Sequence, residues 1–339
     1  MVFIKKESVT IQDVASEAGV AVGTVSRYLN GFKVKKDNRN LIESAISKLN
    51  YKTNIIARSL KTKKSYTIGL LFPSVIDPFA TEIMDAVEEV LYKKNYSVMI
   101  VGSRNSIDIE KERIEFFNNK RIDGLIIMPI SDESYKNIEL LDSNIPVVII
   151  DKKLENDDMT YITCNNRQGS YLGVSNLIEN GHKRIAIVAG PTDVYTSKQR
   201  KQGYIDALVK HNISVDDNLI RHGLYQKGGG VDDIEYFMKM SNPPTAIFTT
   251  NFEITKSAIK YFMKNKISIG NDISLLGYDN IDVFQMLTPK IETIAQPMFQ
   301  IGSKAAELIL EKIGSDSLVQ SVELDTCIVK GESIKNNKG

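Results

Sequence analysis

The sequence has no tryptophan, three histidines and two cysteines, and no apolar run of the ~18 residues that a membrane-spanning helix needs. Cys164 and Cys327 are too few for a disulfide framework, and neither stands at the spacing of a metal site. The first residues, MVFIKKESVT, contain no apolar stretch of signal-peptide length. We therefore expect a soluble protein of the reducing cytoplasm that binds no membrane and no metal.

Residue patterns typical of enzymes are also missing. His182, His211 and His222 each stand near a turn before an expected strand, where histidine is more typical of caps and surfaces than of general bases. The GGG run at 228–230 lacks the Gly-Lys-Ser/Thr sequence of a phosphate-binding loop. No Cys/His/Asp group has zinc spacing. The sequence thus predicts no catalytic residues and no cofactor.

Positive charge is concentrated at the N-terminus. Residues 1–64 contain 13 Lys and Arg against 5 Asp and Glu, a net charge of +8, whereas the rest of the chain carries −7. A solvated lysine-rich tail would be poor in apolar residues, but this segment is patterned like a folded unit. A basic head on an acidic body indicates that the head alone contacts a polyanion. The length of 339 residues allows two or three domains.

The basic segment has the pattern of two short helices joined by a tight turn. Residues 10–30 read TIQDVASEAGVAVGTVSRYLN, in which Thr10 is a good N-cap and Gly19 stands where the turn needs a left-handed residue. The inward-facing positions are Ile11, Val14, Ala15 and Ala18 in the first helix, and Val25 and Leu29 in the second. The basic surroundings favour a helix-turn-helix, with its second helix in the DNA major groove, over an ordinary helical hairpin.

The stretch VTIQDVASEAGVAVGTVSRYLN, followed by KLNYKTNIIARSLKTKKSYTIGLLFP, resembles the lactose-repressor (LacI/GalR) family of bacterial transcription regulators, and the resemblance covers nearly the whole chain. It implies a third helix over 38–49 and a hinge helix over 54–60, whose Leu60 wedges into the minor groove. The inward positions of the third helix would be Leu41, Ile42, Ala45 and Leu49. The expected DNA contacts are Thr10, Val22, Gly23, Thr24, Ser26, Arg27, Asn30, Asn54, Arg58 and Leu60.

The head departs from the family pattern at three places. Ala21 stands where the family usually has a serine that caps the recognition helix, and losing that cap should cost about 1 kcal/mol. Thr53 replaces the usual proline at the entry of the hinge. Val22 and Gly23 stand where bulky polar residues are common, so base recognition is expected to depend on Arg27 and on DNA shape.

From residue 66 onward, short apolar runs alternate with amphipathic segments. The runs lie at 67–72, 96–101, 124–128, 147–150, 184–189, 245–250 and 273–278, and the clearest helical segments at 79–94 and 297–313. The runs lack a period-two pattern, as expected for strands buried on both faces. The sequence therefore predicts an α/β fold with two doubly wound parallel-sheet lobes, preceded by a small all-α head.

The resemblance implies that these lobes are like those of periplasmic binding proteins and enclose a cleft. The expected domains are a helix-turn-helix head at 1–51, a hinge helix and linker at 52–65, and an effector-binding and dimerisation domain at 66–339. In the last domain, one lobe would comprise 66–162 and 294–321, and the other 163–293 and 322–335.

Polar residues follow four of the expected strands, where open parallel sheets bind ligands. They are Asp77, Asp151, Asn251 and Asp279. Asp and Asn are ordinary turn and cap residues, but together with Arg200 they form a donor and acceptor set suited to hydroxyl groups. Phe79 and Tyr225 supply aromatic faces for a sugar ring. The resemblance implies that these seven positions line the effector cleft, with one departure at Phe252, where the family usually has aspartate.

The sequence thus predicts a cytoplasmic transcription regulator, most simply a repressor of carbohydrate genes, that binds operator DNA and is controlled by a small sugar-like effector. The absence of a leucine-heptad tail after Gly331 favours a homodimer over a tetramer. One alternative keeps DNA binding but uses a phosphorylated carrier protein as co-effector, as the catabolite-control branch of the family does. A plain exported sugar-binding protein would not carry a +8 head, and an enzyme on the same fold is the third alternative.

If the head carries all of the DNA affinity, a protein that starts at Tyr66 should bind its ligand but no operator. The affinity of the intact protein should fall steeply between about 50 and about 200 mM salt, because phosphate contacts release counterions. Fluorescence anisotropy with a duplex selected by the intact protein from a random library measures both effects. Specific binding of that duplex by the truncated protein would contradict the assignment.

Overall fold

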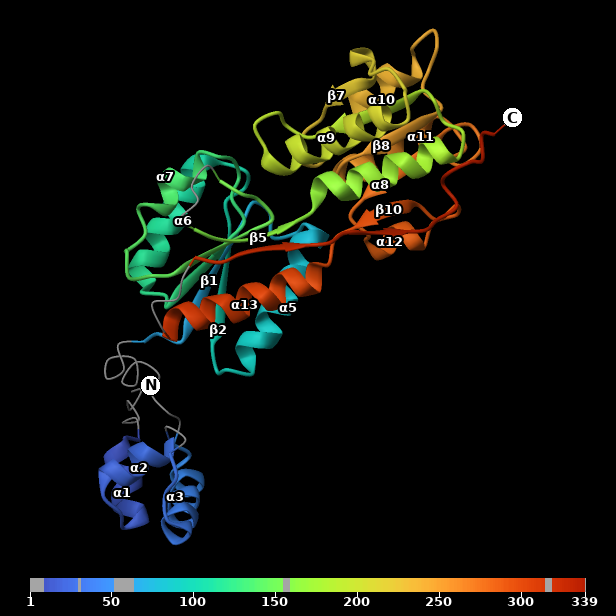
Figure 1. Cartoon of the computed structure of the whole chain (residues 1–339). Coiled ribbons are helices and arrows are strands. Elements are labelled where there is room, and N and C mark those ends of the chain that lie inside the picture. The colour runs from blue at the N-terminus through green and yellow to red at the C-terminus, as the bar shows by residue number, and fades with distance from the viewer. Residues whose placement is uncertain (1–8, 30–31, 52–63, 155–158, 315–318, 339) are drawn as a thin grey trace, which may run out of the picture. The chain divides into compact units, whose positions relative to one another are not determined.

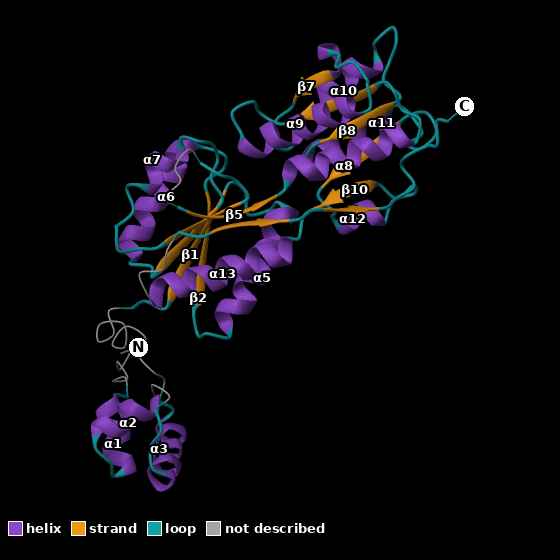
Figure 2. Ribbon diagram, in the orientation of Figure 1, coloured by secondary structure: helices purple, strands orange, loops and turns teal. Residues whose placement is uncertain are grey.

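The computed structural model describes residues 9–29, 32–51, 64–154, 159–314 and 319–338. The chain divides into two compact units, Met1–Ser65 and Tyr66–Gly339. Figures 1 and 2 show that the first unit is a helical head and the second an α/β body. Within the described ranges, no helix is both long and apolar enough to cross a membrane.

The described part of the head consists of three helices. They are α1 (Ile11–Ala18), α2 (Val22–Leu29) and α3 (Lys36–Leu49). A capping box begins α1: the Thr10 hydroxyl accepts from the Asp13 amide, and the Asp13 carboxylate accepts from the Thr10 amide at 2.7 Å. The helix ends at Gly19, whose φ of +63° lies in the left-handed region. The helix-turn-helix predicted from the sequence is confirmed.

One face of each helix contributes to the core of the head. Its buried residues are Val14, Ala15, Ala18, Val25, Ile42 and Ala45. The sequence predicts Leu41 in this core, but the Leu41 side chain is 50% exposed. The stripe of α3 that packs inward is Ile42, Ala45, Ile46 and Leu49, spaced three and four residues apart. Leu41 lies next to this stripe, one residue too early to share its face.

The first lobe of the body is built on a six-stranded sheet in the order β11-β5-β4-β3-β1-β2. The strands are β1 (Thr67–Phe72), β2 (Ser97–Gly102), β3 (Gly124–Ile127), β4 (Val147–Ile150), β5 (Thr160–Cys164) and β11 (Ser321–Leu324), all paired in parallel. The helices are α5 (Pro78–Tyr92) and α13 (Met298–Gly314) on one face, and α6 (Ile107–Lys120) and α7 (Ser134–Ile138) on the other. Gly302 allows close packing of α13 on α5, since a Cβ there would lie 2.4 Å from the Ile83 carbonyl oxygen.

The second lobe has the same architecture, with strand order β12-β10-β9-β8-β6-β7. The strands are β6 (Ile185–Ala189), β7 (Ile220–His222), β8 (Ala246–Thr249), β9 (Ser274–Tyr278), β10 (Glu292–Ala295) and β12 (Cys327–Val329). Only β12 pairs antiparallel, with β10, among these described strands. The helices are α8 (Asn166–Glu179) and α9 (Tyr195–Lys210) on one face, and α10 (Val231–Met238) and α11 (Phe252–Lys264) on the other, with short α12 (Asp282–Gln285) after β9 and a 3-10 turn (Asp217–Leu219) before β7.

The chain passes between the two sheets three times, after β5, after β10 and after β11. Because β11 extends through Leu324 and pairs with β5, the last crossing comes after 324 rather than near 322. The predicted pair of parallel-sheet lobes is confirmed. The apolar runs do not reveal β5, β7, β10, β11 or β12, because these strands are short or mix polar with apolar residues. β2 is an edge strand and therefore half-exposed, not buried on both faces as its apolar run suggests.

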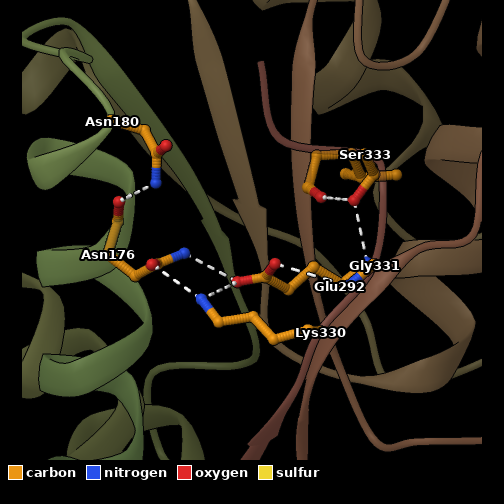
Figure 3. Close-up of polar contacts among 7 residues, drawn as sticks. Asn176, Asn180, Glu292, Lys330, Gly331 and Ser333 are labelled. Carbon is orange, nitrogen blue, oxygen red and sulfur yellow. Dashed lines mark hydrogen bonds and ion pairs between the residues drawn. The ribbon is translucent and has the colours of Figure 1, made fainter. Parts of the chain in front are cut away.

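A buried carboxylate holds the C-terminal segment on the second lobe (Figure 3). Glu292 is 3% exposed, and its Oε1 accepts from Asn176 Nδ2 at 2.6 Å and pairs with Lys330 Nζ at 3.3 Å. Its backbone amide donates to Ser333 Oγ at 2.8 Å. These contacts join α8, β10 and the chain that follows the third crossing. Removing one partner of a buried ion pair is strongly destabilising, because the other charge stays buried without a partner. The pair therefore fixes where the chain after the third crossing packs on the second lobe.

Ala21 occupies the N-cap position of α2, where the Thr24 and Val25 amides bond to its carbonyl and no side-chain cap exists. We expect Ala21→Ser to raise the free energy of unfolding of the head by up to about 1 kcal/mol, because the new hydroxyl accepts from an amide of the first turn. Thr10→Ala, which breaks the capping box of α1, should lower it by a similar amount. Urea unfolding of residues 1–51, followed by circular dichroism, measures both; equal midpoints for wild type and Ala21→Ser would contradict the cap.

Candidate functional site

A pocket lies between the two lobes of the body, at the carboxyl ends of strands from both sheets. The seven residues expected from the sequence all line it: Asp77, Phe79, Asp151, Arg200, Tyr225, Asn251 and Asp279. Eight further residues, which the sequence patterns did not indicate, also line it: Pro73, Ser74, Ala80, Asn105, Met128, Lys152, Thr196 and Gln296. Three of these also come shortly after strands: Gln296 directly after β10, Ser74 two residues after β1 and Asn105 three residues after β2. Ser74 and Asn105 follow strands that the apolar runs predict, whereas β10 gave no apolar run that could have pointed to Gln296.

Two carboxylates of the first lobe face the pocket. Asp77 is the N-cap of α5, and its Oδ1 accepts from the Phe79 amide at 3.0 Å. Burial, together with the negative charge of Asp279, raises the pKa of Asp77 to about 6. Asp151 follows β4 with a φ of +68°, in the left-handed region that aspartate tolerates better than most residues. Burial raises its pKa, while Arg200 opposes the shift.

The guanidinium of Arg200 is the centre of the second lobe's side of the pocket. Its Nε donates to Asn166 Oδ1 at 2.8 Å, and its Nη1 donates to the Thr250 carbonyl at 2.6 Å. The guanidinium carbon lies 3.7 Å from the centroid of the Tyr278 ring, whose hydroxyl donates to the same Asn166 oxygen at 3.0 Å. Arg200 is only 3% exposed. Its orientation is therefore fixed before any ligand binds, which lowers the entropic cost of binding.

Asp279 and Asn251 are held by backbone amides. Asp279 accepts from the Phe252 amide at 3.0 Å and from Gln296 Nε2 at 2.7 Å. Asn251 is the N-cap of α11, and its Oδ1 accepts from the Ile254 amide at 2.9 Å. Both therefore act as cap or turn residues and as pocket residues at once. An Asp or Asn after a strand can therefore cap a helix or turn and line a ligand pocket at the same time.

Phe252, where the resemblance expects aspartate, does not line the pocket. Its ring packs in the core of the second lobe, 5.5 Å from the Phe284 ring, with Lys256 Nζ 4.7 Å from its centroid. Only its backbone amide acts at the site, through the bond to Asp279. The departure from the family therefore removes a carboxylate from this position and adds to the core.

The two aromatic residues flank the polar groups. Tyr225 lies against Gly190, where a Cβ would come within 2.1 Å of the tyrosine ring. Glycine at 190 is thus needed for the ring to take this place. The Tyr225 hydroxyl is 3.3 Å from Thr250 Oγ1, and Phe79 is 7% exposed. An apolar ring face beside fixed polar groups is a common feature of small-ligand sites.

Lys152 is the cation of the first lobe at the pocket. It is 8% exposed, and its Nζ donates to the carbonyls of Pro129 and Ile130 at 2.5 and 3.0 Å. Burial lowers its pKa, an effect that neighbouring Asp151 opposes. The loop that provides these carbonyls also reaches the other lobe, because Asp132 pairs with Lys198 of α9 at 3.3 Å. The sequence pattern gave no signal for Lys152, since a lysine beside a turn is normally solvated.

The structure places part of the expected DNA-contact set on α1 and α2. Val22, Gly23 and Arg27 are exposed, and Val22 is 42% exposed. Thr24 and Ser26 are half-buried, and Thr10 is exposed but engaged in the capping box. The Arg27 guanidinium lies 5.9 Å from the centroid of Phe32. Asn30, Asn54, Arg58 and Leu60 lie outside the described residues.

One histidine and one cysteine of the body, His182 and Cys164, are buried. His182, 1% exposed, bonds to Thr245 Oγ1 and to the Lys335 carbonyl, which ties down the C-terminal segment. Cys164 is buried in the core of the first lobe. In the part of the chain that the structure describes, no group of three or more His, Cys, Asp or Glu is placed to hold a metal ion.

Comparisons with known families define the class of protein. The family model described as "Periplasmic binding proteins and sugar binding domain of LacI family" matches residues 65–331. The model of "Bacterial regulatory proteins, lacI family" matches residues 10–54, which contain the helix-turn-helix. The chain belongs to the LacI family of bacterial regulatory proteins.

Individual relatives agree with this assignment. The HTH-type transcriptional repressor PurR of Actinobacillus pleuropneumoniae serotype 3 (strain JL03) is 32% identical over 332 residues, covering 96% of this chain and 98% of the repressor. The Lac repressor dimer bound to operator and the anti-inducer ONPF has a TM-score of 0.86 at 26% identity, covering 97% and 100% of the two chains. A LacI family regulator from Enterococcus faecium with bound ribose has a TM-score of 0.71 at 27% identity, covering 80% and 100%. The chain is a transcription regulator and not an enzyme.

The raised pKa of Asp77 makes stability depend on pH. Because its pKa is about 6 in the folded chain against 3.8 ordinarily, the folded state binds the proton more tightly, and stability falls as pH rises between these values. Asp77→Asn keeps the cap but removes the charge. We expect its stability advantage over wild type to grow by roughly 1 to 3 kcal/mol between pH 4 and pH 7 and to be constant above.

Urea unfolding of the full chain at several pH values measures this advantage. Asp85→Asn, at an exposed position of the same helix, is the control and should show no such trend. If the stability advantage of Asp77→Asn did not change with pH, the surroundings would not raise the pKa of the Asp77 carboxylate.

Proposed function

We propose that this regulator represses carbohydrate genes and that a small sugar-like effector, bound in the interlobe pocket, controls its binding to operator DNA. The observation that supports the proposal most directly is the convergence of seven expected polar and aromatic residues in one pocket. Carboxylate and amide oxygens held by backbone amides, and a guanidinium held by oxygen acceptors, are suited to hydroxyl groups. The aromatic rings of Phe79 and Tyr225 beside them are suited to the apolar face of a sugar.

The relatives support the same assignment. The matched body family is described by its sugar-binding domain, and the Enterococcus faecium regulator was solved with ribose. The Lac repressor was solved as a dimer on its operator. By analogy we propose a homodimer of the cytoplasm that binds operator DNA through residues 1–51, with 52–65 as hinge and 66–339 as effector-binding and dimerisation domain.

We propose that the hinge couples the two functions. Two hinges side by side in the dimer, with Leu60 in the minor groove, would order together on the operator. Lobe closure around the effector would change the spacing of the two hinge starts. Such coupling is reciprocal: if effector weakens operator binding, operator weakens effector binding by the same factor, typically about 5- to 150-fold.

The pocket proposal is tested by a thermal-shift screen of the full chain with neutral sugars, uronates, sugar phosphates and purine bases, because a ligand that binds only the folded state raises the melting temperature. We expect a sugar to stabilise the protein. A phosphorylated carrier protein belongs in the same screen, and stabilisation by the carrier alone would favour the co-effector alternative.

The variant Arg200→Lys tests whether the ligand binds in this pocket. Lysine keeps the charge but cannot donate to Asn166, to Thr250 and to a ligand in the fixed geometry of the guanidinium. We expect ligand affinity, measured by calorimetry, to fall at least about tenfold while operator affinity without ligand is unchanged. Arg167→Lys, at a 55% exposed side chain on α8, is the control. Unchanged ligand affinity in Arg200→Lys would place the site elsewhere.

A further inference from the structure

We propose that the pocket accepts an uncharged ligand rich in hydroxyl or N–H donors and rejects the carboxylate- and phosphate-bearing forms of the same sugar, with Asp77 as the residue that sets this selectivity. The inference rests on the proposed function, since it concerns the same pocket. It follows from the balance of donors, acceptors and charges among the residues that line the cavity.

Acceptor groups dominate the wall of the pocket. The carboxylates of Asp77, Asp151 and Asp279 come from three different loops and line one cavity. They are close enough to act on each other: the charges of Asp279 and Asp151 both contribute to the raised pKa of Asp77. Glu253, at the start of α11, contributes in the same direction. A ligand that enters this space therefore meets a concentration of negative charge.

Gln296 adds an acceptor that has no partner. The side chain lines the pocket and the residue is 6% exposed. Its Nε2 donates to Asp279 at 2.7 Å, which fixes the orientation of the amide, because a carboxylate needs a donor. Its Oε1 is buried without a hydrogen-bond partner among the described residues. A buried, unpaired carbonyl oxygen is costly, so a ligand donor that reaches it gains more than an ordinary hydrogen bond.

The two cations of the pocket are already engaged. Lys152 Nζ donates to two backbone carbonyls, and Arg200 donates to Asn166 and to the Thr250 carbonyl while its face lies on Tyr278. Their charges face those of Asp151 and Asp279, which leaves Asp77 without a cation of its own among the lining residues. Arg200 retains N–H donors for a neutral acceptor such as a ring oxygen.

The consequence is a site that discriminates by charge. A neutral hydroxyl donates to a carboxylate and forms a charge-assisted hydrogen bond, which is stronger than a neutral one. A carboxylate or phosphate on the ligand would lose its hydration and face three carboxylates, while the charges of Arg200 and Lys152 are already offset by Asp151 and Asp279. Asp77→Asn removes the surplus charge while keeping the polar side chain and the cap of α5.

The test compares matched ligands by calorimetry on the full chain at pH 7.5. The sets are glucose, glucuronate and glucose 6-phosphate; galactose, galacturonate and galactose 6-phosphate; and ribose and ribose 5-phosphate. We expect the neutral member of the binding set to bind, and its acid and its phosphate to bind roughly 100-fold more weakly or not at all. In Asp77→Asn this ratio should shrink about tenfold or more, whereas Asp85→Asn should leave it unchanged.

The outcomes separate the inference from the proposed function. If an acid or phosphate binds as tightly as its neutral parent, the inference is overturned but the sugar-binding proposal stands. If the ratio is the same in Asp77→Asn as in wild type, Asp77 does not set the selectivity. If no sugar of any set binds, or only a purine base from the wider screen does, both the inference about sugars and the proposed effector class are wrong.

Discussion

The contact between the guanidinium of Arg200 and the ring of Tyr278 organises the body of this regulator. Arg200 comes from α9 and Tyr278 ends β9, and both donate to the same oxygen of Asn166, the first residue of α8 after the first crossing between the lobes. Asn166 in turn donates to the Cys164 carbonyl at 2.9 Å, at the end of β5. One buried cation thus links a crossing segment, two helices and a strand. Any motion of the lobes about that crossing takes place next to the group that faces the ligand.

Other residues around the pocket also serve both the fold and the site. Asp77 and Asn251 end the loops after strands, cap the following helices and line the cavity. Asp279 holds the start of α11 through the Phe252 amide. Because each group serves the fold and the site, these side chains are oriented before ligand binds, and like charges are kept together at the expense of stability. The raised pKa of Asp77 is the sign of that cost, and it is also the basis of the proposed selectivity.

Local sequence rules succeeded where one short-range interaction decides the structure. Thr10 and Gly19 bound α1 as expected, because a cap and a left-handed turn depend on a few neighbouring residues. The strand-end rule brought four polar residues, Asp77, Asp151, Asn251 and Asp279, to one pocket, because carboxyl ends of parallel strands share an edge. It omitted Gln296 only because β10, with the sequence ETIA, has too little apolar character to be recognised as a strand. The prediction that Leu41 packs in the core of the head was wrong for a different reason. Leu41 and Ile42 are both apolar, and only the packing of α3 decides which of them faces the core.

What the sequence by itself determined is the division into a basic helical head and an acidic α/β body, because charge and hydrophobic periodicity are local properties of the chain. What only the tertiary structure decided is which charges meet. Lys152 looks like a surface lysine in the sequence, yet it is buried against two carbonyls of another loop. Phe252 looks like a substitution in the site, yet its ring lies in the core. The direction of a side chain and the partner of a charge depend on residues far away in the chain, and folding alone brings them together.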